Sequence, residues 1–208
     1  MYKRQPLNYN TELGVTKTIR ENLLPIHEIF VCEMGARYVN DIQAICDIVH
    51  PRYGVITSIG PQHLESFGSI ENIVKTKFEL YESIPDDGMM FLNYDNEYIR
   101  NYKGMKPQTG FGSSPDAQFR LLNMDVSASG TVFRVDIPGE GAQEFATELI
   151  GEHNVLDITA AIAVAYSLGV TVPELKKRVK KIRPVEHRLQ LLPRRGRITI
   201  IDDAYNSN

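Results

Sequence analysis

The sequence feature that most constrains the fold is an alternation of apolar runs and helical patterns in the first half of the chain. Runs of strand length cover residues 27–34, 53–59 and 89–92. Residues 41–49 and 70–84 lie between them and carry apolar side chains at helical spacing. Strands that alternate with helices through short connections are typical of a parallel sheet wrapped by helices. We therefore predict an α/β fold with a parallel sheet flanked by helices.

Short alternating runs replace this pattern after Asn93, and Gly, Ser, Pro and Asp separate them. They cover residues 110–112, 119–124, 131–137 and 145–150. Runs of this kind predict an antiparallel β meander at the end of the sheet.

Two further helical patterns and one more strand complete the chain. The helical patterns cover residues 154–168 and 172–181, and Pro173 lies in the first turn of the second. Residues 197–201 predict a strand. Residues 183–196 carry polar side chains towards this strand and predict a linker, so we place a domain boundary near it.

The composition excludes two classes of partner. The 208 residues carry a formal net charge of −3, which predicts no attraction to nucleic acid or to an anionic membrane surface. The longest apolar stretch, around residues 160–165, is far too short to span a bilayer.

Cys32 and Cys46 lie in apolar segments and are expected to be reduced core thiols. No export signal is visible, so we expect a cytoplasmic protein.

Two candidate metal ligands follow predicted strands. Glu33 ends the first strand and precedes Gly35, and His63 comes shortly after the second strand. Because open α/β sheets place ligands at the carboxyl ends of their strands, both side chains are candidates for one site. A carboxylate and a neutral imidazole are both competent metal ligands. The residues alone leave two alternatives open: Glu33 as an acid that caps the next loop, and His63 as an ordinary hydrogen-bonded histidine.

Three other candidates lie on a helix and in the last segment. Lys75 and Lys77 are two positions apart on the predicted helix, so only one of them can face the site. The alternative is a solvated Lys/Glu face. Arg188 offers bidentate contacts to phosphate oxygens, and Asp203 lies just past a strand, where a carboxylate can accept ribose hydroxyls. Here the alternative is a surface ion pair.

Seven strings along the chain, taken in order, resemble the Mur ligase family. Those around His63 and at the carboxyl end are specific, and the others are weak singly. In one-letter code they are NYNTELGV from Asn8, EMGA from Glu33, IGPQHLESFGS from Ile59, KFE from Lys77, GEHNV from Gly151, HR from His187 and DDAYNSN from Asp202. The Tyr-Asn pair at positions 205 and 206 resembles the branch of the family that adds D-alanyl-D-alanine, because other branches show an Ala-His pair there.

The resemblance implies a central, P-loop NTPase-like domain and an ATP-driven amide synthesis. ATP would phosphorylate the terminal carboxylate of a UDP-N-acetylmuramoyl tripeptide. The amine of D-alanyl-D-alanine would then attack the acyl phosphate. Two magnesium ions and positioned cations would neutralise the γ-phosphoryl group. The family also implies a monomer.

The resemblance implies a role for each matching residue. Glu33 and His63 would be magnesium ligands, and Lys77 would be a carbamylated lysine that presents a carboxylate-like group to the second metal. Arg188 would contact the γ-phosphate, so Lys77, His63 and Arg188 would form the catalytic set. The other nucleotide contacts would come from Asn154 to the adenine, from Asp203 to the ribose, and from Asn10 and Thr11 near the phosphates.

The sequence departs from the family pattern at both ends. The Gly-rich phosphate loop ending Gly-Lys-Thr/Ser is expected just before Asn8, and no such string occurs in the 208 residues. We therefore predict a chain truncated at both ends and inactive alone. Residues 1–5 would be an artefactual tail, residues 6–193 the central ATP-binding domain without its phosphate loop, and residues 194–208 the first strand of the C-terminal ligase domain. Two alternatives stay open: another Mur-type amino acid or peptide ligase, and a non-catalytic partner protein that has lost ATP binding.

Overall fold

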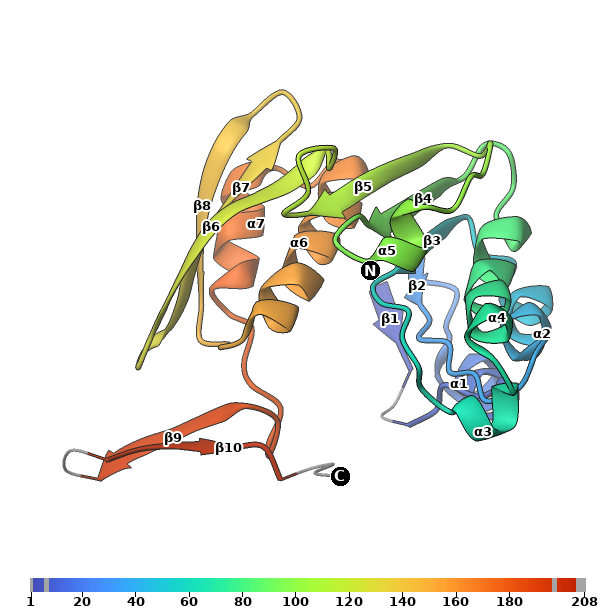
Figure 1. Cartoon of the computed structure of the whole chain (residues 1–208), viewed down its shortest axis with the longest axis horizontal. Coiled ribbons are helices and arrows are strands. Elements are labelled where there is room, and N and C mark those ends of the chain that lie inside the picture. The colour runs from blue at the N-terminus through green and yellow to red at the C-terminus, as the bar shows by residue number, and fades with distance from the viewer. Residues whose placement is uncertain (1, 6–7, 196–197, 205–208) are drawn as a thin grey trace. The chain divides into compact units, whose positions relative to one another are not determined.

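The computed structural model describes residues 2–5, 8–195 and 198–204 (Figure 1). The chain divides into two compact units. Unit 1 holds Met1–Met90 and Tyr102–Pro107, and unit 2 holds Phe91–Asn101 and Gln108–Asn208.

Unit 1 consists of short strands and four helices. β1 (Tyr2–Arg4) pairs in parallel with β2 (Ile29–Val31). The other elements are α1 (Glu12–Asn22), α2 (Asp41–Val49), β3 (Tyr53–Ile56), α3 (Leu64–Phe67), α4 (Ile70–Ser83) and the first residues of β4 (Met89–Asn93).

The two predicted helices of unit 1 are confirmed. α2 has the predicted bounds, and α4 ends one residue earlier than expected. The hydroxyl of Ser69 caps α4 by accepting the N–H of Asn72, and Pro85 follows the last turn. α2 and α4 pack against each other. Their apolar spacing buries Ile45 and Phe78, at 1% and 2% exposure, in the core of the unit.

Unit 2 joins most of a sheet to two covering helices. Its elements are the end of β4, α5 (Glu97–Arg100), β5 (Gln108–Gly112), β6 (Phe119–Ser127), β7 (Gly130–Ile137), β8 (Gly141–Thr147), α6 (Glu152–Ser167), α7 (Val172–Val179), β9 (Gln190–Arg195) and β10 (Ile198–Asp202). α6 contacts β5, β6 and β7, and α7 contacts β8 (Figure 1). Phe133 of β7 and Phe145 of β8 stack on each other and are buried.

The largest sheet has the strand order β3-β4-β5-β6-β7-β8, and the division between the units falls within β4. Helices flank this sheet, which confirms the predicted α/β class. Among the described residues, no helix is both long and apolar enough to cross a membrane.

The predicted meander is wrong at its first strand. β5 pairs with β6 in parallel, so only β6, β7 and β8 form the antiparallel meander. The carboxylate of Asp95 accepts the N–H groups of Ser113 and Ser114 at the end of β5. These bonds lie at the start of the short connection between β5 and β6. After this connection β6 runs beside β5 with Phe119 opposite Phe111. The sequence contains no local signal for this connection, because Asp95 is far from it in the chain.

Several boundaries also differ from the predictions. β8 covers 141–147 rather than 145–150, and the predicted linker over 183–196 contains β9. β9 pairs antiparallel with β10, the strand expected at 197–201. Residues 2–4, set apart from the fold in the sequence analysis, are strand β1. The sequence patterns also missed α1, α3 and α5, because α3 and α5 are single turns and α1 buries only Val15 and Thr18.

Candidate functional site

Three of the sequence strings meet at one small cavity in unit 1. The cavity has a volume of about 40 Å³. Ala36 of the first string, His63 of the second and Lys77 of the third line it together. The other lining residues are Ser58, Gly60 and Gln62, with Phe67 and Ile73 on its apolar side. The fold therefore brings together segments that are spread over 41 positions of the sequence, from Ala36 to Lys77.

The structure selects Lys77 rather than Lys75 for this cavity. Lys75 is exposed, whereas Lys77 is half-buried and lines the cavity, as helical geometry requires of residues two apart. Burial lowers the pKa of the Lys77 amine, and the negative charge of Glu33 opposes this shift. The lower pKa increases the neutral, nucleophilic fraction of the amine at any given pH.

Glu33 is held by the segment that precedes α1. The side-chain amide of Gln5 donates to the Glu33 carbonyl at 2.6 Å and accepts the Glu33 N–H at 3.1 Å. The Asn10 amide donates to the Glu33 carboxylate at 3.1 Å, and the Asn10 carbonyl accepts the N–H of Gly35 at 2.7 Å. A Cβ at Gly35 would lie 3.0 Å from Asn10 Cγ, so the close approach depends on glycine. The Glu33 side chain itself is exposed.

His63 lies at the turn that starts α3. Its φ of 54° is in the left-handed region, which is uncommon for a residue with a side chain. Its carbonyl accepts the N–H groups of Ser66 and Phe67, and its exposed imidazole lies at the cavity. In the part of the chain that the structure describes, no three His, Cys, Asp or Glu side chains gather as a metal site.

The two remaining candidates of unit 1 have structural contacts. Asn10 bonds Glu33 as described, and the Thr11 hydroxyl accepts the N–H of Gly14 and thereby caps α1. Gln5 was missed in the sequence analysis. The only feature that could have indicated its role is its position one residue beyond β1. There its side chain bonds the backbone of Glu33 and so extends the pairing of β1 with β2.

Asn154, Arg188 and Asp203 are the nucleotide-binding candidates of unit 2, and each lies on a segment that contains Leu189 or approaches it. The Leu189 N–H donates to the carboxylate of Asp203 at 3.1 Å. Its Cδ1 would lie 3.1 Å from a Cβ placed on Gly151, the residue before α6. Asn154 is in the first turn of α6, and its side-chain amide donates to the Ile150 carbonyl. Arg188 precedes Leu189 and is exposed.

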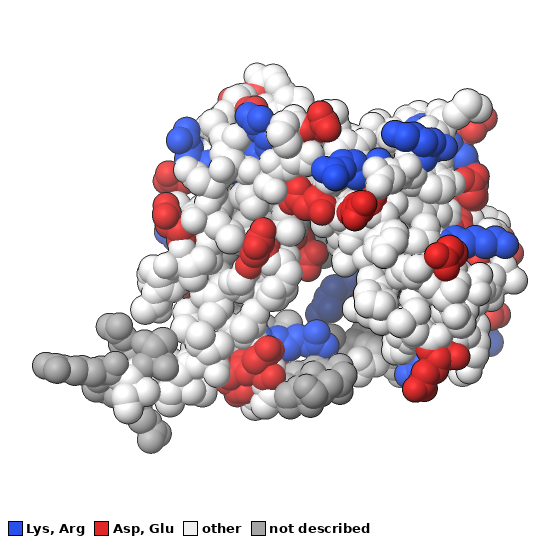
Figure 2. Space-filling model, in the orientation of Figure 1, with Lys and Arg blue, Asp and Glu red and all other residues white. Residues whose placement is uncertain are grey.

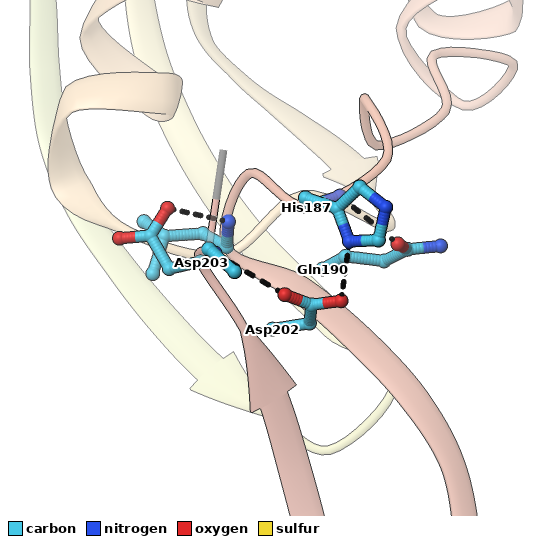
Figure 3. A network of polar contacts seen from close by, with 6 residues as sticks. His187, Gln190, Asp202 and Asp203 are labelled. Atoms are coloured by element: carbon cyan, nitrogen blue, oxygen red, sulfur yellow. Dashed lines mark hydrogen bonds and ion pairs between the residues drawn. The ribbon is translucent and has the colours of Figure 1, made fainter. Parts of the chain in front are cut away.

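The loop that carries Arg188 is conformationally restricted. His187 and Leu189 flank it with φ values of 62° and 42°, and a non-glycine residue in the left-handed region costs about 1–3 kcal/mol. Figure 3 shows the contacts that hold this loop: His187 Nδ1 is 2.7 Å from the Asp202 carboxylate, and the His187 N–H donates to Gln190. The hydrogen bond from His187 lowers the pKa of Asp202.

Charged side chains of both signs lie on one face of the described residues (Figure 2). Lys and Arg side chains are interspersed with Asp and Glu on the face shown in Figure 2, and neither sign dominates there. This distribution agrees with the formal net charge of −3.

Fold and site together define the class of protein. The model of the Mur ligase middle domain family matches residues 2–165, which is most of the chain. The chain therefore belongs to the Mur ligase family.

Two similar proteins have names that are more specific than that of the family. UDP-N-acetylmuramoyl-tripeptide–D-alanyl-D-alanine ligase of Escherichia coli K12 is 28% identical over 205 residues, which cover 97% of this chain and 45% of that protein. The enzyme of the same name from Mycobacterium leprae is 32% identical over 218 residues, covering 98% and 42%.

Solved structures agree with these matches. A crystal structure of MurF from Acinetobacter baumannii superposes with a TM-score of 0.89 at 27% identity, covering 100% of this chain and 45% of that one. MurF of Thermotoga maritima in complex with ADP gives 0.88 at 25% identity, covering 99% and 47%. The chain thus spans somewhat less than half the length of the relatives that it matches.

Proposed function

We propose that this chain is the central part of an ATP-dependent ligase that joins D-alanyl-D-alanine to a UDP-N-acetylmuramoyl tripeptide. The reaction serves peptidoglycan precursor synthesis in the cytoplasm, and the protein acts as a monomer. The similarity to the D-alanyl-D-alanine ligases of Escherichia coli and Mycobacterium leprae supports this choice of substrates.

One observation carries the proposal: the cavity of unit 1 collects Ala36, His63 and Lys77 from three separate strings. Lys77 lines this cavity and is half-buried, whereas a solvated lysine face would leave it exposed as Lys75 is. Burial of an ammonium is costly, and the lowered pKa of Lys77 reflects that cost, which the charge of Glu33 partly offsets.

The donor set fits magnesium. Mg²⁺ is commonly held by one or two carboxylates together with substrate phosphates and water, rather than by a complete protein cage. Glu33 offers an exposed carboxylate whose orientation Asn10 fixes, and His63 offers a ring nitrogen. When bound, the metal ions neutralise charge on the transferred phosphoryl group.

Lys77 supplies the further anion. Its neutral amine attacks carbon dioxide, the new N–C bond forms, and the amine releases one proton to give a carbamate. The modified side chain replaces a cation by a carboxylate-like group, which suits the second metal ion. The lowered pKa of Lys77 favours this reaction, because only the neutral amine is nucleophilic.

Five residues supply the nucleotide contacts in this proposal. Asn154 contacts the adenine, Asp203 the ribose and Arg188 the γ-phosphate, and Asn10 and Thr11 lie near the phosphates. The contacts of Leu189 with Asp203 and beside Gly151 support a common role for the segments that carry the first three residues. ATP phosphorylates the tripeptide carboxylate, the amine of D-alanyl-D-alanine attacks the acyl carbon, and phosphate leaves the tetrahedral intermediate.

The first experiment detects the carbamate directly. The purified chain is equilibrated with ¹³C-labelled bicarbonate, and a carbamate carbon is sought by NMR. We expect the signal in the unmodified chain, its loss in Lys77→Ala, and its retention in Lys75→Ala, which changes an exposed lysine on the same helix. A signal that survives Lys77→Ala would remove Lys77 from the metal site.

The second experiment addresses turnover. The 208 residues contain no Gly-Lys-Thr/Ser phosphate loop, so we expect the purified chain to release no phosphate from ATP. In a ligase that contains this chain together with such a loop, we expect Lys77→Ala to abolish ligation and short carboxylates or bicarbonate to restore part of it. Full turnover by that variant contradicts the proposal.

A further inference from the structure

The loop that carries Arg188 is anchored from both sides by the end of β10. His187 precedes Arg188, and its ring nitrogen is 2.7 Å from a carboxylate oxygen of Asp202. Leu189 follows Arg188, and its N–H donates to Asp203 at 3.1 Å. Two consecutive acids therefore hold the two neighbours of one exposed arginine.

The anchored conformation is not one that the loop prefers by itself. Both neighbours of Arg188 have left-handed backbone angles, and glycine occupies neither position. A backbone of this kind persists only where surrounding contacts determine it. The Arg188 N–H donates to the Val185 carbonyl, and the His187 N–H donates to the Gln190 side chain, which completes the turn.

We propose that the pair of His187 and Asp202 is a positioning device, which orders the backbone at Arg188 so that its guanidinium is presented to a phosphoryl group. The inference rests on the proposed phosphate-binding role of Arg188 and extends it to two residues that need not contact the nucleotide. A pre-oriented arginine loses less conformational entropy when it binds, so its affinity for phosphate rises.

The titratable groups around the pair come from three segments of the chain. Asp202 and Asp203 come from the end of β10, Glu186 and Arg188 from the loop itself, and His153 lies beside Leu189 at the start of α6. The carboxylate of Asp202 also accepts the Ala204 N–H, which fixes its orientation. The pKa of Asp202 is below its ordinary value, chiefly because of the bond from His187, so the contact is complete above the ordinary carboxyl pKa. It is lost as the pH falls through the lower value.

The test uses the purified 208-residue chain and inorganic tripolyphosphate as the probe. Binding at neutral pH is followed by NMR on the arginine side-chain N–H groups. We expect His187→Ala and Asp202→Asn each to weaken binding about three- to tenfold, the range expected when one ordered side chain is released. We expect His187→Asn to retain most of the affinity, because the asparagine amide replaces the Nδ1 donor and asparagine tolerates a positive φ. Asp87→Asn breaks an exposed ion pair with Arg52 in unit 1 and is the matched control.

A second measurement separates the phosphate-binding role of Arg188 from the positioning role of the pair of His187 and Asp202. The carboxyl carbon of Asp202 is titrated by NMR, and amide hydrogen exchange is measured at Arg188. We expect His187→Ala to return the Asp202 pKa towards its ordinary value and to accelerate exchange at Arg188. If Arg188→Ala leaves tripolyphosphate binding unchanged, the phosphate role of Arg188 fails, although the titration and exchange can still show that the pair orders the loop. If Arg188→Ala abolishes binding while His187→Ala and Asp202→Asn bind as the unmodified chain does, the positioning inference is overturned.

Discussion

Glu79 offers the sharpest test of how unit 1 is held together. It is a charged side chain on α4 with only 8% exposure, and it does not line the cavity. Its carboxylate accepts the N–H of Asn40 at 2.8 Å and that of Gln43 at 3.0 Å, both at the start of α2. Asn40 makes no side-chain cap of its own. Glu79 therefore caps a helix from which it is more than thirty residues distant.

The contacts of Glu79 allow an estimate of its contribution. Each backbone N–H that loses its acceptor in a half-buried place costs about 1 kcal/mol. A carboxylate at a helix N-terminus contributes about 1 kcal/mol more through the helix dipole when it is partly buried. We expect Glu79→Ala to destabilise α2 by about 3 kcal/mol. We expect Glu79→Gln to destabilise it by about 2 kcal/mol, because the amide oxygen still accepts one N–H but the charge and the other bond are lost.

Hydrogen exchange of the α2 amides is the appropriate measurement, because a chain with two units need not unfold in a single step. A loss of about 3 kcal/mol corresponds to a roughly hundredfold larger open population. Glu21→Ala, an exposed position at the end of α1, serves as control and should change exchange by less than threefold. If Glu79→Ala leaves exchange in α2 within threefold of the unmodified chain, the carboxylate does not hold the helix, and the reasoning fails.

Three further predictions concern the same unit. Lys106→Ala removes an ammonium that donates to the carbonyls of Glu82 and Ile84 at the end of α4, so we expect the free energy of opening of that helix, measured by amide hydrogen exchange, to fall by about 1 kcal/mol. Gly35→Ala places a methyl group 3.0 Å from Asn10 Cγ, and we expect a loss of about 1 kcal/mol together with NMR shifts at Asn10; an unshifted Asn10 would contradict the close approach. Burial and the hydrogen bond to the Glu82 carboxylate raise the pKa of Tyr102, so a difference titration against Tyr102→Phe should find its phenol ionising above the ordinary tyrosine pKa, and Glu82→Gln should lower that pKa.

The sequence predicted those elements whose signals are local. α4 was found with nearly its true bounds because the apolar spacing lies within it and Pro85 lies beside it. Helix geometry alone indicated that only one of two lysines can face the site, since Lys75 and Lys77 cannot face the same side. The structure then identified Lys77 as the one at the cavity. Local periodicity is thus sufficient where a single element decides the orientation of a side chain.

Contacts between distant segments could not be read in the same way. Asp95 accepts the N–H groups at the end of β5, before the parallel pairing with β6, and Glu79 caps α2. Each of these two features needs a partner that no window of neighbouring residues contains. The linker predicted over 183–196 is a different case, because β9 and β10 are adjacent in the chain and form an antiparallel pair that the sequence analysis missed.

Glu33 shows what such distant contacts add to a candidate metal ligand. The sequence identified it by its place after a strand, but it did not indicate what fixes its direction. In the structure Gln5, at 6% exposure, bonds both backbone groups of Glu33, and Asn10 bonds one carboxylate oxygen. The backbone bonds hold the residue, while the Asn10 bond leaves the carboxylate exposed. A ligand that must accept a metal ion needs this combination, because a carboxylate buried by its own supports could not reach the ion and one without supports would lose entropy on binding it.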